Sequence, residues 1–173
     1  SCANIARPTG GPIDTTPPVF VKSNPKPNQL NFNKNKIEIE FDEIIQVDKP
    51  TEKVIVSPAQ KNMPQIQTSG RKVIVELQDS LIPNTTYTID FSDAISDNNE
   101  RNPLYNFSFS FATGNSIDTL QIGGVLLNAE NLEPVTGMLV GLHSNLNDSA
   151  FTKTPMQRIA KSDAYGRFSI KNI

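Results

Sequence analysis

The sequence has a single cysteine, a single histidine and no tryptophan, and these shortages exclude several functions. A disulfide within the chain is impossible, because Cys2 has no second cysteine to pair with. Catalytic metal sites usually take several His, Cys or acidic ligands, so the lone His143 favours a structural or surface role. No Gly-x-Ser-x-Gly turn is present to supply a nucleophilic serine. We therefore predict a protein that is not an enzyme and that uses no cofactor.

Neither sign of charge dominates, and long apolar runs are missing. Sixteen basic and 18 acidic residues give a net charge of −2 without a basic stripe, so nucleic-acid binding has no electrostatic basis. The apolar runs at 125–127 and 138–140 are far shorter than the roughly 20 residues of a membrane-spanning helix. With 36% hydrophobic residues among 173, we expect one or two small domains with modest cores.

The start of the chain carries its only thiol. Small and polar residues surround Cys2, so burial of this side chain in a core is not expected. Ser1-Cys2 resembles the end of a bacterial lipobox, in which a small residue precedes the lipid-modified cysteine. The resemblance implies removal of a signal peptide and a lipid on Cys2, although Ser1 departs from it because processing leaves the cysteine first. An unmodified thiol is the alternative.

Residues 7–18 are rich in Pro, Gly and Thr. Pro fixes φ and Gly resists ordering, so neither a helix nor a strand is expected there, and such a linker spans roughly 30–40 Å. Together with Cys2, this segment resembles the amino termini of Bacteroidota outer-membrane lipoproteins that carry an Ig-like domain. We therefore expect residues 1–18 to be a lipid-anchored tether at the outer membrane. The resemblance implies that surface export goes with acidic residues directly after the cysteine; Cys2 has none after it, which favours the periplasmic leaflet, but both leaflets stay open.

From Val19 onward, apolar residues alternate with polar ones, which is typical of half-buried strands. The pattern predicts strands at 36–42, 53–57, 85–91 and 105–112, and a hairpin at 65–77 that turns at Ser69-Gly70. We expect about seven strands between Val19 and Thr113, a short turn at 43–47 and no helix. The spacing is typical of an antiparallel sandwich.

Four segments, 25–27, 39–43, 81–89 and 107–114, resemble the bacterial Ig-like domain of surface-layer-type proteins. The resemblance implies an all-β chain with an Ig-like antiparallel β-sandwich over residues 19–114. The segment 93–102 departs from it, because the glycine that the family carries there is missing.

A second unit is expected at 119–173. Its Gly123-Gly124-Val125, Pro134-Val135 and Asp163-Ala164-Tyr165-Gly166-Arg167-Phe168 resemble the transthyretin-like, or carboxypeptidase-regulatory-like, domain. Asp163 is expected to close an Asx turn, and Gly166 to take positive φ. Three or four strands do not close a sandwich, so we expect an incomplete β-sandwich, completed by residues beyond Ile173 or by a partner chain.

Candidate binding residues are few. Asp93, Asp97, Asn99 and Glu100 offer oxygen ligands for Ca²⁺, but they lack the alternating acids and central glycine of a calcium loop, so a solvated loop is favoured. The alternating Phe107, Phe109 and Phe111 predict a core strand rather than a sugar-stacking platform. The aromatic residues expected at the surface are Tyr105 and Tyr165.

These observations favour a non-enzymatic outer-membrane lipoprotein. The resemblance implies a structural or docking subunit of a barrel-assembly, secretion or nutrient-import complex, with the other subunits and the membrane as partners. A carbohydrate-binding or adhesive module is the first alternative. An enzyme whose catalytic part follows Ile173 is the second.

Overall fold

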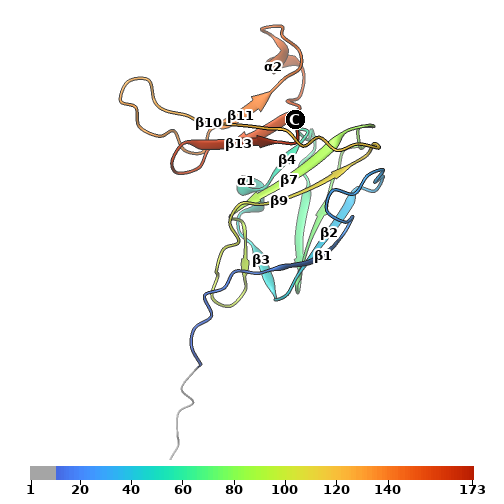
Figure 1. The fold of residues 1–173 in the computed structure, drawn as a ribbon, viewed down its shortest axis with the longest axis vertical. Helices are drawn as coiled ribbons and strands as arrows, with labels where there is room; N and C mark the ends of the chain where they lie inside the picture. Colours follow the sequence, from blue (N-terminus) through green and yellow to red (C-terminus); the bar gives the residue numbers. More distant parts are fainter. Residues whose placement is uncertain (1–10) are drawn as a thin grey trace, which may run out of the picture.

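The computed structural model describes residues 11–173, and the regular secondary structure of this part of the chain is almost wholly short strands (Figure 1). Two helices of one turn each, α1 (Pro50–Lys53) and α2 (Ala150–Lys153), interrupt them. The strands are β1 (Phe20–Asn24), β2 (Lys36–Phe41), β3 (Ile45–Val47), β4 (Ile55–Ser57), β5 (Gln65–Ser69), β6 (Lys72–Glu76), β7 (Thr86–Ser92), β8 (Ile95–Asp97), β9 (Phe107–Ala112), β10 (Gln121–Val125), β11 (Leu139–Leu142), β12 (Arg158–Lys161) and β13 (Arg167–Lys171).

Two antiparallel sheets face each other and form the sandwich. One has the strand order β1-β2-β6-β5, and the other has the order β4-β7-β9. Four strands facing three in this order is the arrangement of the constant-type immunoglobulin domain. The predicted all-β, Ig-like antiparallel sandwich is therefore confirmed.

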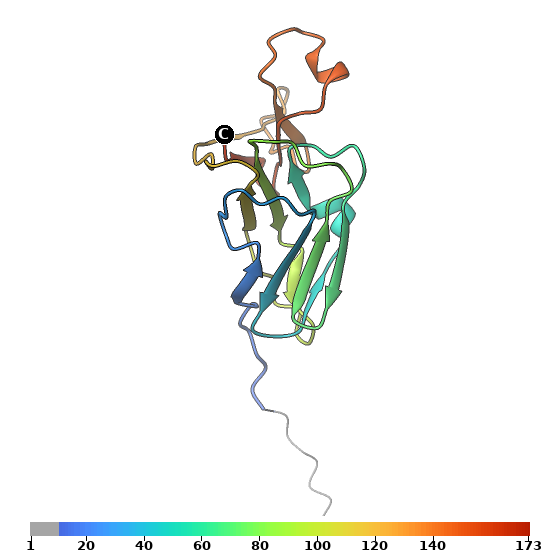
Figure 2. The ribbon, with the colours of Figure 1, turned by 90° about the vertical axis from the view of Figure 1, so that its right-hand side faces the viewer.

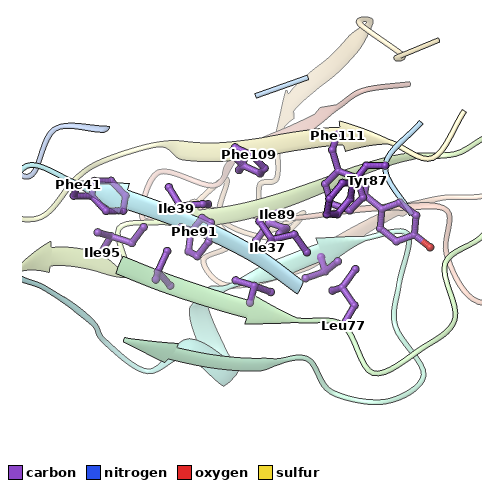
Figure 3. Close-up of a cluster of buried hydrophobic side chains, with 14 of the residues drawn as sticks. Ile37, Ile39, Phe41, Leu77, Tyr87, Ile89, Phe91, Ile95, Phe109 and Phe111 are labelled. Carbon is purple, nitrogen blue, oxygen red and sulfur yellow. The ribbon is translucent and has the colours of Figure 1, made fainter. Parts of the chain in front are cut away.

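The core comes from residues at every second position of the predicted strands. On β2, Ile37, Ile39 and Phe41 are fully buried between the sheets (Figure 3). On β7, Tyr87, Ile89 and Phe91 point into the same core, as predicted. On β9, Phe109 and Phe111 are buried and Phe107 packs at the edge of the cluster, so the alternating phenylalanines are core residues.

Tyr87 joins this core to the connection that precedes β7. Its ring stacks on Phe111 with centroids 5.3 Å apart, and its hydroxyl accepts a hydrogen bond from the Ile82 N–H at 2.9 Å. A tyrosine at the start of this strand that binds backbone a few residues upstream is the tyrosine corner of Ig-like sandwiches. Burial raises the pKa of Tyr87 above its ordinary value, so the ring stays neutral.

About seven strands were predicted before Thr113; the two sheets of the sandwich contain seven, but this region forms nine in all. The two additional strands are β3 and β8, which pair only with each other, with Ile45 opposite Asp97. The segment 43–47 is therefore not a turn. At three residues each, β3 and β8 are too short to show alternation in the sequence. The one-turn helix α1 was also not predicted, and Pro50 begins it, since its fixed φ suits a first turn.

Two predicted turns are confirmed. Gly70 lies between β5 and β6 with φ of 59°, in the left-handed region that favours glycine. At the second turn, Gly166 has φ of 72°. There the Asp163 carboxylate accepts hydrogen bonds from the Tyr165 and Arg167 N–H groups at 2.8 and 2.9 Å.

The strands after residue 118 form two antiparallel pairs, β10 with β13 and β11 with β12. They lie at the end of the sandwich opposite to the point where residues 11–19 leave it (Figures 1 and 2). β12, which was not predicted, contacts β4. Among the described residues after 118, the buried hydrophobic ones are only Ala150, Ala160 and Ile170. This unit therefore has almost no core of its own, and its larger apolar side chains are exposed, including Leu120, Ile122, Val125, Leu127, Leu132, Met138, Leu139, Leu146 and Phe151.

Candidate functional site

Cys2, the predicted lipid attachment residue, lies outside the described residues 11–173. The part of the predicted tether that is described, residues 11–18, has neither helix nor strand. Its contact with the sandwich is at Asp14, whose backbone oxygen accepts a hydrogen bond from the Asn102 side-chain amide at 3.0 Å. The tether therefore meets the sandwich at the loop after β8.

Two of the predicted calcium ligands, Asn99 and Glu100, lie in that loop, and a third, Asp97, ends β8 directly before it and has another role. Its side chain is 1% exposed, and its carboxylate accepts hydrogen bonds from the N–H groups of Glu100, Arg101 and Asn102 at 2.6, 2.9 and 2.6 Å. Burial opposes ionisation, but these amide donors outweigh it and lower the pKa of Asp97. Asp97 thus holds the loop closed through backbone groups of its own chain.

The other predicted ligands do not join Asp97. Asp93 pairs with Lys53 at 3.2 Å, and Lys53 also pairs with Asp48 at 3.0 Å. Across residues 11–173, no three His, Cys, Asp or Glu side chains form a group that could hold a metal ion. The expectation of a fully solvated loop at 93–102 also needs correction, because Ile95–Asp97 is the buried strand β8.

His143 and the exposed aromatic residues do not belong to a cluster of chemically reactive side chains in residues 11–173. His143 is partly buried, and its Nε2 has no hydrogen-bond partner in the described part of the chain. Tyr105 and Tyr165 are each 68% exposed, as expected, and the Arg167 guanidinium lies 5.6 Å from the Tyr165 ring centre. The rings that pair with one another in residues 11–173 belong to the sandwich core, so no stacked aromatic platform is found there.

A polar joint connects the C-terminal strands to the outer face of the β4-β7-β9 sheet. At its centre, the Asn172 side-chain oxygen accepts hydrogen bonds from the hydroxyls of Thr88 (2.8 Å) and Ser110 (3.0 Å). Beside it, the Lys171 ammonium donates to the Ser108 hydroxyl at 3.1 Å. These small hydroxyl residues alternate with the buried apolar residues of β7 and β9, so the outer sheet face forms hydrogen bonds where the inner face excludes water.

Arg158 forms the second half of the polar joint. Its Nε donates to the Asn172 backbone oxygen at 2.6 Å, and its Nη2 lies 3.3 Å from the Asp118 carboxylate. Asp118 also donates its N–H to the Thr86 hydroxyl at 2.9 Å. Burial lowers the pKa of Arg158, and the nearby Asp118 charge opposes that shift. The buried guanidinium is thus compensated by the hydrogen bonds that it donates to Asn172, Gln157 and Asp118.

Two clefts lie beside the polar joint. One, of about 710 Å³, is lined by residues of both units, among them Tyr87, Asp118 and Arg158. The other, of about 610 Å³, lies beside the edge strands β4 and β5 and is also lined by Leu139, Ile159 and Lys161 of the C-terminal strands; we call it the β4–β5 groove. Its apolar lining comprises Val54, Ile55, Val56, Ala59, Met63, Pro64, Ile66, Leu139 and Ile159. Both clefts are large enough to hold a ligand. The sequence did not reveal either cleft, because each is built from segments distant in the chain.

None of the helices in residues 11–173 has the length and apolar character needed to cross a bilayer.

Comparison with known proteins identifies the fold but not a reaction. Of the solved structures with similar folds, the methionine-rich copper resistance protein PcoC of Escherichia coli is 14% identical, with a TM-score of 0.40, over 55% of this chain and 96% of that one. An L,D-transpeptidase of Mycobacterium smegmatis is 8% identical, with a TM-score of 0.37, over 91% and 77%.

The N-terminal part of the bacterial S-layer protein SbsC is 18% identical, with a TM-score of 0.38, over 87% of this chain and 32% of that one. No curated protein matches the sequence. The family model of the bacterial Ig-like domain matches residues 14–113, more than half of the chain. This chain therefore belongs to the bacterial Ig-like domain family.

Proposed function

We propose that this chain is a non-enzymatic structural and docking subunit of an outer-membrane protein complex, held to the membrane by lipid on Cys2. The complex that we propose for this subunit is a barrel-assembly, secretion or nutrient-import complex. The observation that carries it is the polar joint, because it fixes a second unit to an Ig-like sandwich without forming a catalytic group.

The positions of the two ends support a spacer. Residues 11–19 leave the sandwich at one end, and the C-terminal strands lie at the other (Figure 1). A lipid on Cys2 therefore places the sandwich between the membrane and those strands. More than one acyl chain makes such an anchor stable, at about 0.8 kcal/mol for each buried methylene.

The C-terminal strands support the docking part of the proposal. We infer that residues 119–173 are part of a transthyretin-like unit, separate from the sandwich at 19–114 and the tether at 1–18. The unit buries little apolar surface of its own, and apolar residues such as Ile122, Leu127 and Leu139 remain exposed. Exposed apolar surface of this kind marks interaction sites in proteins.

The anchor is tested by changing the thiol in a cell that processes lipoproteins. The Cys2→Ala variant should move from the membrane fraction to the soluble fraction, while Thr9→Ala, a matched change in the same tether, should stay with the membrane. If Cys2→Ala remains bound at wild-type levels, lipid attachment at Cys2 is wrong. Protease treatment of intact cells then distinguishes the surface leaflet from the periplasmic one, because only the surface form is cleaved.

The docking role is tested by mild purification from detergent-solubilised membranes. If the chain is a subunit, it should elute from size-exclusion chromatography together with envelope proteins in fixed ratios, at a mass well above that of the single chain. A second sample is crosslinked in intact cells before purification. Recovery of the chain alone from that sample would contradict the role.

A carbohydrate-binding or adhesive module is the second candidate, and the exposed Tyr105 and Tyr165 favour it. Glycan-array binding that is lost in Tyr165→Ala would support this alternative, and binding unaffected by both tyrosine variants would exclude their role as a platform.

A further inference from the structure

The outer edge of β5 has backbone groups that no strand of the sandwich uses. β5 pairs only with β6, and Ser69 stands opposite Lys72 across the turn. In a two-residue hairpin the closing pair is hydrogen-bonded and the pairs then alternate, so the N–H and C=O groups of Ile66 and Thr68 point away from β6. The neighbouring strand β3 reaches only the Gly70 end of this edge, where the Ile45 N–H donates to the Gly70 oxygen at 3.1 Å.

Beside this edge lies the β4–β5 groove, which offers apolar contacts and one unpaired acceptor. Ile66 and Val56 lie in its wall, and Met63 stands on its rim with 65% of its surface exposed. The side-chain oxygen of Gln60, which also lines the groove, is buried and has no hydrogen-bond partner within residues 11–173.

A segment of this chain already docks against the end of β4, beside the groove, through one backbone hydrogen bond and the Ser57 hydroxyl. The Ala59 N–H donates to the Met156 oxygen at 3.1 Å. The Ser57 hydroxyl accepts from the Ile159 N–H at 3.0 Å and donates to the Ile159 oxygen at 3.3 Å. The segment 156–159 thus runs along the end of β4, and the β4–β5 groove continues this interface beyond Ile159. The surface is therefore suited to extended backbone.

We propose that the β4–β5 groove binds an extended segment of a partner protein, which pairs with β5 through Ile66 and Thr68 and places alternate apolar side chains in the groove. This proposal rests on the docking role proposed above and names the surface that performs it. Main-chain hydrogen bonds supply affinity in strand addition, and pockets for alternate side chains supply specificity. Lys61 and Lys161 outnumber Glu52 in the lining, so the segment carries net negative charge.

The test uses the full 1–173 chain, expressed without lipid, and a phage library of random linear octapeptides as the probe. Thr68→Pro removes the backbone N–H of residue 68, which points to the free edge and takes no part in the β5–β6 hydrogen bonds. An edge strand accepts proline at such a position. Met63→Asp places a charge on the groove rim. The matched controls are Gln67→Ala, on the same strand, and Leu132→Asp, at an exposed apolar residue outside the groove. Circular dichroism verifies that each variant folds. If Thr68→Pro does not fold, Met63→Asp alone tests the groove.

Enriched peptides should alternate apolar and polar residues, with an acidic excess. Their affinity should fall at least tenfold for Thr68→Pro and for Met63→Asp, and stay within twofold for both controls. The proposal is overturned if no peptide is enriched, or if the binders tolerate both groove variants. It is also overturned if the chain dimerises with concentration and Thr68→Pro abolishes the dimer, because the occupant is then a second copy.

This experiment fails independently of the proposed function. Panning measures a surface of the lipid-free chain, whereas fractionation of Cys2→Ala measures the anchor. If no peptide binds the lipid-free chain but Cys2→Ala is released from the membrane, the groove proposal alone is overturned. If peptides bind as expected but Cys2→Ala stays in the membrane fraction, the anchor alone is overturned.

Discussion

Replacing Tyr87 by Phe removes one hydroxyl from the sandwich and leaves the packing of the ring in place. The Ile82 N–H then loses its acceptor at 2.9 Å, while the stacking on Phe111 remains. Because Tyr87 is fully buried, the Phe ring fills almost the same volume and no large cavity forms. The change therefore isolates the hydrogen bond of the tyrosine corner.

The expected loss follows from the donor that is left behind. Ile82 is 50% exposed, so water can reach the freed N–H, and the loss is the net contribution of one hydrogen bond, about 0.5–1.5 kcal/mol. With a urea m-value of about 2 kcal/mol/M for a protein of this size, the unfolding midpoint should fall by about 0.25–0.75 M at constant m.

Equilibrium urea unfolding, followed by far-UV circular dichroism, measures this midpoint. Tyr105→Phe is the control, because Tyr105 is exposed and its hydroxyl makes no hydrogen bond in the described residues, so its effect should stay within about 0.5 kcal/mol. A Tyr87→Phe midpoint equal to that of Tyr105→Phe would refute the structural role assigned to the hydroxyl.

Three further results are expected. The lowered pKa of Asp97 gives stability that is present above the unfolded pKa of about 3.9 and is lost as the pH falls through the folded value. The free energy of unfolding in urea should therefore differ less between pH 7 and pH 3 for Asp97→Asn than for wild type. Equal differences for the two proteins would argue against the amide contacts. In the polar joint, Thr88→Val and Asn172→Ala should show a coupling of about 0.5–1.5 kcal/mol in a double-mutant cycle, and strict additivity would mean that their contact is not formed. Gly166→Ala should lower amide-exchange protection after residue 118 more than Gly70→Ala lowers it in the β5–β6 hairpin. Both glycines have positive φ, but only at Gly166 would a Cβ clash with the Leu126 oxygen. Equal losses of protection would exclude that clash.

The sandwich follows from the sequence wherever a strand is long enough to show its period. Six or seven residues of alternation, as in β2, β7 and β9, predicted both the strand and its buried face. β3 and β8 have three residues each and no such signal, so only their pairing in space defines them. The turns at Gly70 and Gly166 were predictable because glycine reports a backbone requirement directly.

The candidate sites were harder to predict for the same reason. Asp97 looks like a metal ligand in the sequence, but its acceptors are used by amides three to five residues ahead, a relation that depends on the loop conformation. The polar joint pairs Thr88 with Asn172 across 84 positions, and nothing local to either residue signals the contact. The β4–β5 groove depends on the edges of two sheets, which the strand order alone establishes.

The most direct measurement for the account as a whole is the mass of the amino-terminal peptide from the native protein, isolated from membranes. The account predicts a peptide that begins at Cys2 and carries acyl chains through the cysteine. A peptide of the same region with a free thiol and no added mass would contradict the anchor and, with it, the placement of the sandwich as a spacer at the outer membrane.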